Sequence, residues 1–138
     1  MAFTPIQGDS GKYVEIGAAT GVTFVKGNAV KDSSGAGYIT NAAAGDNTPV
    51  HFVVMESKTT TANGEKVLCV KVEGVTFLAD CDAAWSVTDV LTEADLAAAG
   101  QVDPDASTDD IFFIERGVGI AETGTQVIGH FLHGDPQA

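Results

Sequence analysis

Short apolar runs recur along the whole chain, and turn-forming residues separate them. Ten runs are rich in β-branched and aromatic residues: KYVEI, VTFV, NAVK, GYIT, PVHFVVME, KVLCVKVE, VTFLA, IFFIER, VGIA and QVIGHFL. Glycine, asparagine and serine fill the gaps between them, at intervals of about 8 to 12 residues. This rhythm predicts an all-β fold, either a small barrel or a sandwich.

Two neighbouring runs predict a hairpin. The segment Pro49–Glu56 is apolar at successive positions, which is typical of a central strand covered on both faces. The segment Lys66–Glu73 alternates and becomes polar toward its end, so we expect it to be half-buried. Asn63-Gly64 lies between them and suits a tight turn.

One segment departs from the β pattern. In TEADLAAAG, Thr92 can cap a first helical turn while Asp95 reaches back to it, the alanines and Leu96 favour helix, and Gly100 can end it. We therefore expect one short helix here, inside an excursion from the β-domain over residues 80–110. The chain re-enters the sheet at Ile111.

The first ten residues predict an extended N-terminal arm, followed by a single β-domain over residues 11–138. Phe3 and Ile6 are mixed with Pro5 and Gly8, which disfavours a regular element. A chain of 138 residues fits one domain with one core.

Composition disfavours several classes of partner. Nineteen acidic residues against seven basic ones give a net charge of -12, which repels phosphate and disfavours nucleic acid and anionic membranes. The apolar runs are far shorter than the ~18 to 20 residues that span a bilayer. The N-terminus has no basic start and no apolar h-region, so we expect synthesis in the cytoplasm without an export signal.

The acidic run DPDASTDD, residues 103–110, is the strongest candidate for chemistry. Asp103, Asp105, Ser107 and Asp109 match the first four ligand positions of a calcium loop. The position that needs a turn glycine holds Thr108, however, and the twelfth position holds an isoleucine where a bidentate carboxylate belongs. We expect a solvated acidic loop and no metal site.

The remaining candidates favour structural roles. His130 and His133 are spaced as HxxH, but a strand places them on opposite faces, and His51 is expected to be a partly buried strand histidine with a hydrogen-bond partner. Cys69 and Cys81 either pair or stay free, and their apolar contexts favour free, buried thiols. No nucleophile motif, dinucleotide fingerprint or P-loop occurs, so we expect no enzyme and no cofactor.

Two stretches carry a resemblance to a known family. The first is FVKGNAVKDSSGAGYITNAAAGDNTPVHFVVMES, in which a lysine-glycine turn, a glycine-linked strand and an AAAGD turn lead to a central apolar strand. The second is the glycine-punctuated hairpin RGVGIAETGTQVIGHFL. Together they resemble the small head decoration (cement) proteins of tailed bacteriophages.

The resemblance implies a virion protein that binds the major capsid protein from outside, stabilises the expanded lattice and often forms trimers. Phe3, Pro5 and Ile6 are then candidates for capsid docking through the arm, by strand addition or as apolar anchors. Two other classes remain open: another virion β-module, such as a tail tube or fibre, and an extracellular calcium-binding adhesion module.

Overall fold

The computed structural model describes residues 2–33, 37–120 and 123–132, and in this part of the chain the fold is all-β. The prediction of fold class is confirmed. One 3-10 turn, η1 (Val87–Asp89), interrupts the strands, and no helix in the described ranges is long and apolar enough to cross a membrane.

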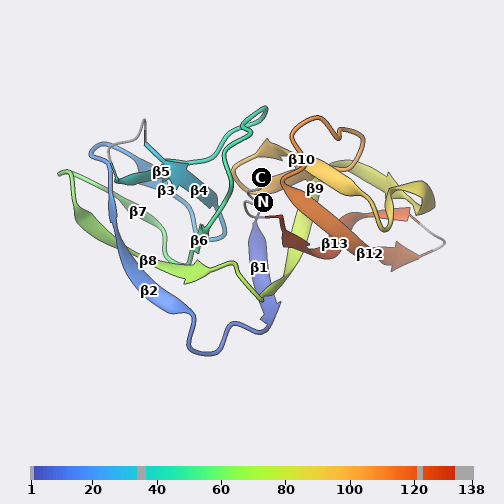
Figure 1. Ribbon diagram of the computed structural model, residues 1–138, viewed down its shortest axis with the longest axis horizontal. Coiled ribbons are helices and arrows are strands. Elements are labelled where there is room, and N and C mark those ends of the chain that lie inside the picture. Colours follow the sequence, from blue (N-terminus) through green and yellow to red (C-terminus); the bar gives the residue numbers. More distant parts are fainter. Residues whose placement is uncertain (1, 34–36, 121–122, 133–138) are drawn as a thin grey trace.

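Five strands form a first closed barrel, on the left in Figure 1, in the order β2-β5-β4-β6-β8. Their bounds are β2 (Tyr13–Ala18), β5 (Ile39–Asn41), β4 (Ala29–Asp32), β6 (Phe52–Val54) and β8 (Glu65–Lys71). A short pair lies beside them, β3 (Thr23–Phe24) with β7 (Lys58–Thr59). The predicted antiparallel pairing is confirmed, because Val53 is opposite Val70 and Val54 opposite Cys69. The predicted tight turn is wrong, because residues 55–64 connect the two strands and contain β7, which pairs with β3.

The second barrel, on the right in Figure 1, is built from the later strands in the order β9-β11-β10-β12-β13, and a pairing of β13 with β9 closes it. The bounds are β9 (Thr76–Ser86), β11 (Gln101–Asp103), β10 (Glu93–Ala98), β12 (Phe112–Ile120) and β13 (Thr123–Phe131). The β12–β13 hairpin predicted from the last strands of the sequence is therefore present.

The first strand, β1 (Phe3–Gln7), lies between the two barrels and pairs with β9. The prediction of a separate arm is corrected here, since Phe3 is opposite Ala79 in the ladder and its ring is buried. Burial of the phenylalanine and the ladder hydrogen bonds both favour this docked position over a free arm.

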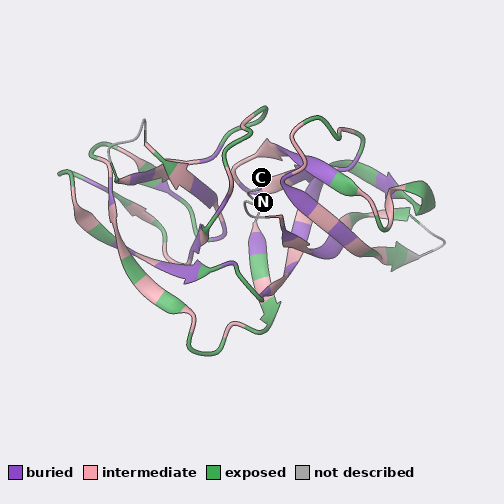
Figure 2. Ribbon diagram, viewed as in Figure 1, coloured by how far each residue is buried: buried purple, intermediate pink, exposed green. Residues whose placement is uncertain are grey.

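A shared core joins the barrels. Within the first barrel, Val54 and Cys69 point inward to a small cluster, while Val53 and Val70 point the other way, as strand alternation requires. Val53 and Val70 belong to a larger cluster that continues into the second barrel, and purple buried segments accordingly face one another across the junction in Figure 2.

The predicted helix is wrong, and the 80–110 segment is no excursion. Residues 93–98 form strand β10, with Ala94 opposite Phe112 on β12 and Leu96 opposite Val102 on β11. Helix propensity is a weak preference, and ladder pairing on both edges together with burial of Ala94 and Leu96 outweighs it. The segment supplies three of the strands of the second barrel.

Glycines in the closing hairpin allow Trp85 to pack tightly. A Cβ added at Gly117 would lie 2.1 Å from Cζ2 of Trp85, and one at Gly124 would lie 3.0 Å from its Nε1. The indole N–H donates to the carbonyl of Val118 at 3.3 Å. The Trp85 ring thus explains Gly117, while Gly119 and Gly124 are required mainly because a Cβ there would lie 2.1 Å from the carbonyl oxygen of Thr123 and 2.3 Å from that of Val118.

Candidate interaction surfaces

The acidic loop 103–110 folds around a buried carboxylate, that of Asp95 on β10. The backbone N–H groups of Thr108, Asp109 and Asp110 donate to its Oδ1 at 3.0, 2.7 and 2.9 Å. Burial raises the pKa of Asp95, but these three hydrogen bonds outweigh burial and hold the pKa below its usual value. Sequence reasoning predicts that Asp95 caps a helix, and it misses that this carboxylate accepts the backbone hydrogen bonds of the acidic loop.

Two other carboxylates of this loop, those of Asp103 and Asp105, lie near Asp82 on β9. Burial raises the pKa of Asp82, and the nearby charges of Asp103 and Asp105 raise it further. Residues 2–33, 37–120 and 123–132 contain no group of three or more His, Cys, Asp or Glu residues that could hold a metal ion. The arrangement concentrates negative charge at one end of the second barrel.

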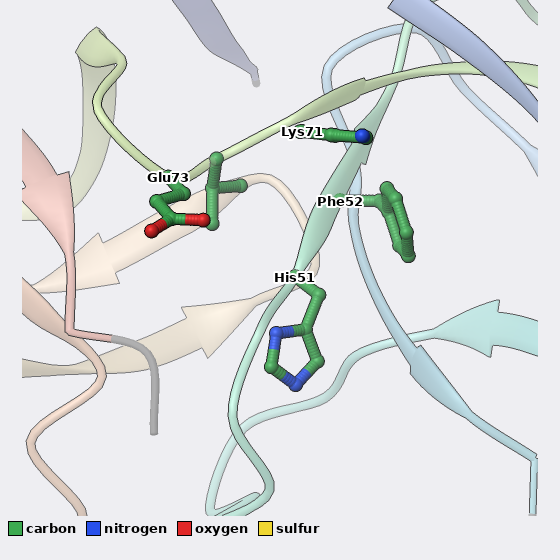
Figure 3. A pocket seen from close by; sticks show the side chains of 5 residues that line it. His51, Phe52, Lys71 and Glu73 are labelled. Carbon is green, nitrogen blue, oxygen red and sulfur yellow. The ribbon is translucent and has the colours of Figure 1, made fainter. Parts of the chain in front are cut away.

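The histidines differ from one another in environment. His130 on β13 lies 2.8 Å from the carboxylate of Glu115 on β12, and its ring stacks against Phe113. His133 lies outside the described residues. His51 was expected to be partly buried, but it is exposed just before β6, where it borders two surface hollows (Figure 3).

Both cysteines are free and buried, as predicted. Cys69 belongs to the core of the first barrel and Cys81 to the larger shared core. Burial raises the pKa of each thiol to about 12, so neither has the thiolate that nucleophilic or redox chemistry needs.

The three proposed docking residues occupy different environments on β1. The ring of Phe3 lies 4.8 Å from that of Phe131 between centroids and is buried, so its assignment as a docking anchor is wrong. Pro5 is half-buried, while Ile6 is 46% exposed and stays a candidate. Tyr13, also exposed, follows at the other end of the β1–β2 loop, which lies at the lower edge of Figure 1.

A hollow of about 180 Å³ opens at the mouth of the first barrel. In the described residues, β2 pairs with β5 at Ala18 and Ile39 alone, and side chains of both strands line the hollow. Four apolar side chains give this mouth hollow its apolar lining: Ile16, Val30, Ile39 and Phe52.

A second, shallower hollow of about 270 Å³ adjoins the mouth hollow and shares His51 and Phe52 with it. Figure 3 shows the side chains of Phe52 and Lys71 projecting to the same side of the two paired strands, with Glu73 on the other side. This hollow is open to solvent, so it can take part in a contact with a protein surface.

An apolar projection lies at the far end of the second barrel, in the connection that contains η1. Leu91 is 69% exposed, and Val87 is exposed in the same connection. Leu91 has φ 64°, a left-handed conformation that costs a leucine about 1 to 2 kcal/mol. Its N–H donates to the carbonyl of Ile114 at 2.7 Å, which holds the backbone in this conformation.

Charge is divided unequally between the barrels. Residues 12–73, which contain the first barrel, carry all six lysines and six acidic residues. Residues 76–132, which contain the second, carry eleven acidic residues and one basic residue, Arg116. One barrel is thus close to neutral, and the other accounts for most of the negative charge.

Comparison with known proteins adds no relative. No family model matches the chain, and no curated protein and no solved structure shows significant similarity to it.

Proposed function

We propose that this chain is a structural protein that binds the outer surface of a bacteriophage capsid, contacts the major capsid protein and stabilises the expanded lattice. Its role is binding without turnover, and the bound form is a trimer. The proposal starts from the resemblance of residues 24–57 and 116–132 to head decoration proteins.

The observation that carries the proposal is the division of charge between the two barrels. A protein on the outside of a filled capsid has to approach the shell without binding packaged DNA. The near-neutral first barrel provides a side that can approach a protein lattice, while the acidic second barrel repels nucleic acid and keeps the free protein soluble.

Ile6 and Tyr13 are the best candidates for lattice contact. Both are exposed apolar side chains, and a loop of five residues, 8–12, connects the strands that carry them. A contact of this size is weak for one copy, so strong binding depends on several copies that bind a repeating lattice together.

The test is co-sedimentation of purified protein with expanded capsids. Deletion of the first strand is unsuitable, because it also removes Phe3 from the core. Ile6→Asp leaves Phe3 in the core. Val25→Asp is a matched control, because Val25 is 50% exposed against 46% for Ile6 and follows β3, beside the first barrel.

We expect Ile6→Asp to weaken capsid binding by about tenfold or more, since it removes an apolar contact and places a charge in it. Val25→Asp should bind like the wild type. If Ile6→Asp binds expanded capsids as strongly as the wild type, Ile6 is not part of the contact. A wild-type protein that ignores expanded capsids but polymerises alone would replace the proposal with a tail-tube assignment.

A further inference from the structure

The exposed projection at Leu91 has the features of a contact residue. Its side chain is the most exposed of the large apolar side chains in the described residues, and a backbone hydrogen bond to Ile114 keeps it turned away from the core. Backbone strain of this kind is found most often where function requires it. We call Val87 and Leu91 together the apolar knob.

The charge around the knob restricts what it can contact. Asp89 and Glu93 flank it, and the rest of the second barrel is strongly acidic. A two-fold contact between the knobs of two copies would place these carboxylates opposite one another, and opposed like charges are unfavourable. The surface that receives the knob therefore has to be apolar and less acidic than the second barrel.

The first barrel of another copy offers such a surface. Its mouth hollow of about 180 Å³ is lined by apolar side chains, and a cavity of about 150 Å³ already admits a benzene molecule. Lys31 and Asp32 both line this hollow, and the ammonium of Lys31 pairs with Asp46 at 2.8 Å, so the charges at the mouth are balanced. The exposed Lys71 lies beyond Phe52. All six lysines lie within residues 12–73, where the acidic residues equal them in number. A contact between unlike barrels therefore brings a near-neutral surface to the acidic barrel of the neighbouring copy.

We propose that copies of this protein associate head to tail, with the apolar knob of one copy inserted in the mouth hollow of the next. The two surfaces are different, so each added copy leaves one knob and one hollow free, and association continues until a ring closes. The inference deepens the proposed function by naming the interface of the trimer, but it requires no capsid and can be tested without one.

The test uses two variants that each block one side of the contact. Leu91→Asp removes the knob, and Pro49→Trp fills the hollow, because Pro49 lines it at the surface. Molar mass is measured by sedimentation equilibrium from micromolar to near-millimolar concentration, and circular dichroism checks that each variant is folded. Val25→Asp again serves as the control.

We expect the wild type and Val25→Asp to associate with rising concentration, and each blocking variant alone to associate about tenfold more weakly or not at all. In a mixture of the two blocking variants, Pro49→Trp supplies an intact knob and Leu91→Asp supplies an intact hollow. The mixture should therefore form a one-to-one dimer and nothing larger. Leu91→Gly should raise the melting temperature by removing backbone strain while it loses association.

Three results would overturn the interface: a wild type that stays monomeric throughout, a Leu91→Asp variant that associates like the wild type, or a mixture that forms no dimer. Failure of capsid binding with association intact would refute the proposed function and leave this interface standing. A Leu91→Asp variant that associates normally but no longer binds capsids would assign the knob to the lattice instead.

Discussion

The carboxylate of Asp95 should contribute a large part of the stability of the second barrel. It is 7% exposed and accepts three backbone hydrogen bonds from the acidic loop. Asp95→Asn keeps the shape and one carbonyl acceptor for the loop N–H groups, but it removes the charge that strengthens these bonds. It also replaces Oδ2, which accepts from the N–H of Thr108 at 3.1 Å, with an NH2 donor. Hydrogen bonds to charged groups are worth about 1.5 to 3 kcal/mol each, and the loop amides can regain water, so we expect a loss of about 2 to 4 kcal/mol.

The effect should depend on pH in a defined direction. The pKa of Asp95 is lowered in the folded protein from its usual 3.8, so its contribution is present above about pH 4 and is lost as the pH falls through the folded-state value. The difference in unfolding free energy between wild type and Asp95→Asn should therefore be constant from about pH 7 to about pH 5, and should shrink below about pH 4.

Urea unfolding, followed by the fluorescence of Trp85, measures this difference. Asp105→Asn is the control, because Asp105 is an exposed carboxylate of the same loop and should change stability by less than about 0.5 kcal/mol. Equal stability of Asp95→Asn and wild type at neutral pH would refute the reasoning. So would a difference that persists unchanged in acid.

Three further predictions concern the second barrel and the thiols. Gly117→Ala should destabilise the protein by about 1 to 3 kcal/mol and shift the emission of Trp85, because the added methyl overlaps its ring; urea titration checks both. Cys69 and Cys81 should not react with Ellman's reagent in the native protein, and both should react in guanidinium; reaction without denaturant would contradict their burial. Asp82→Asn should raise the melting temperature at neutral pH and low salt, because partial desolvation and then the neighbouring carboxylates disfavour the charge of this exposed residue, and the gain should diminish in high salt.

The fold class could be predicted because its signal is local. Each of the ten apolar runs overlaps a strand in the structure, and the pairing of β6 with β8 agrees with their patterns. The same reasoning from local patterns could not distinguish a fold with two barrels from a fold with one. The pairing that closes the second barrel joins β9 to β13, and nothing in either strand alone specifies its partner.

The errors have a common physical origin in long-range contacts. Residues 93–98 have good helix propensity, yet ladder partners on β11 and β12 decide their conformation. Phe3 looked like part of a free arm because its partners, Phe112 and Phe131, are more than a hundred residues away in the sequence. The mouth hollow and the left-handed backbone conformation of Leu91 could not be predicted, because neither produces a recognisable pattern in the amino-acid sequence.

The aromatic cluster also has a consequence for the order of folding. Phe3 packs with Phe112 and Phe131, and Phe77 packs with Phe131, so the cluster requires residues from both extremes of the chain. Contacts so distant in sequence slow folding, because a long loop has to close before they form. During synthesis the first barrel can assemble once β8 has emerged, while β1 waits for β9 and the aromatic cluster for β13. We therefore expect a folding intermediate with one finished barrel and an unpaired first strand, visible as early protection of β2 and β8 amides in pulsed hydrogen exchange.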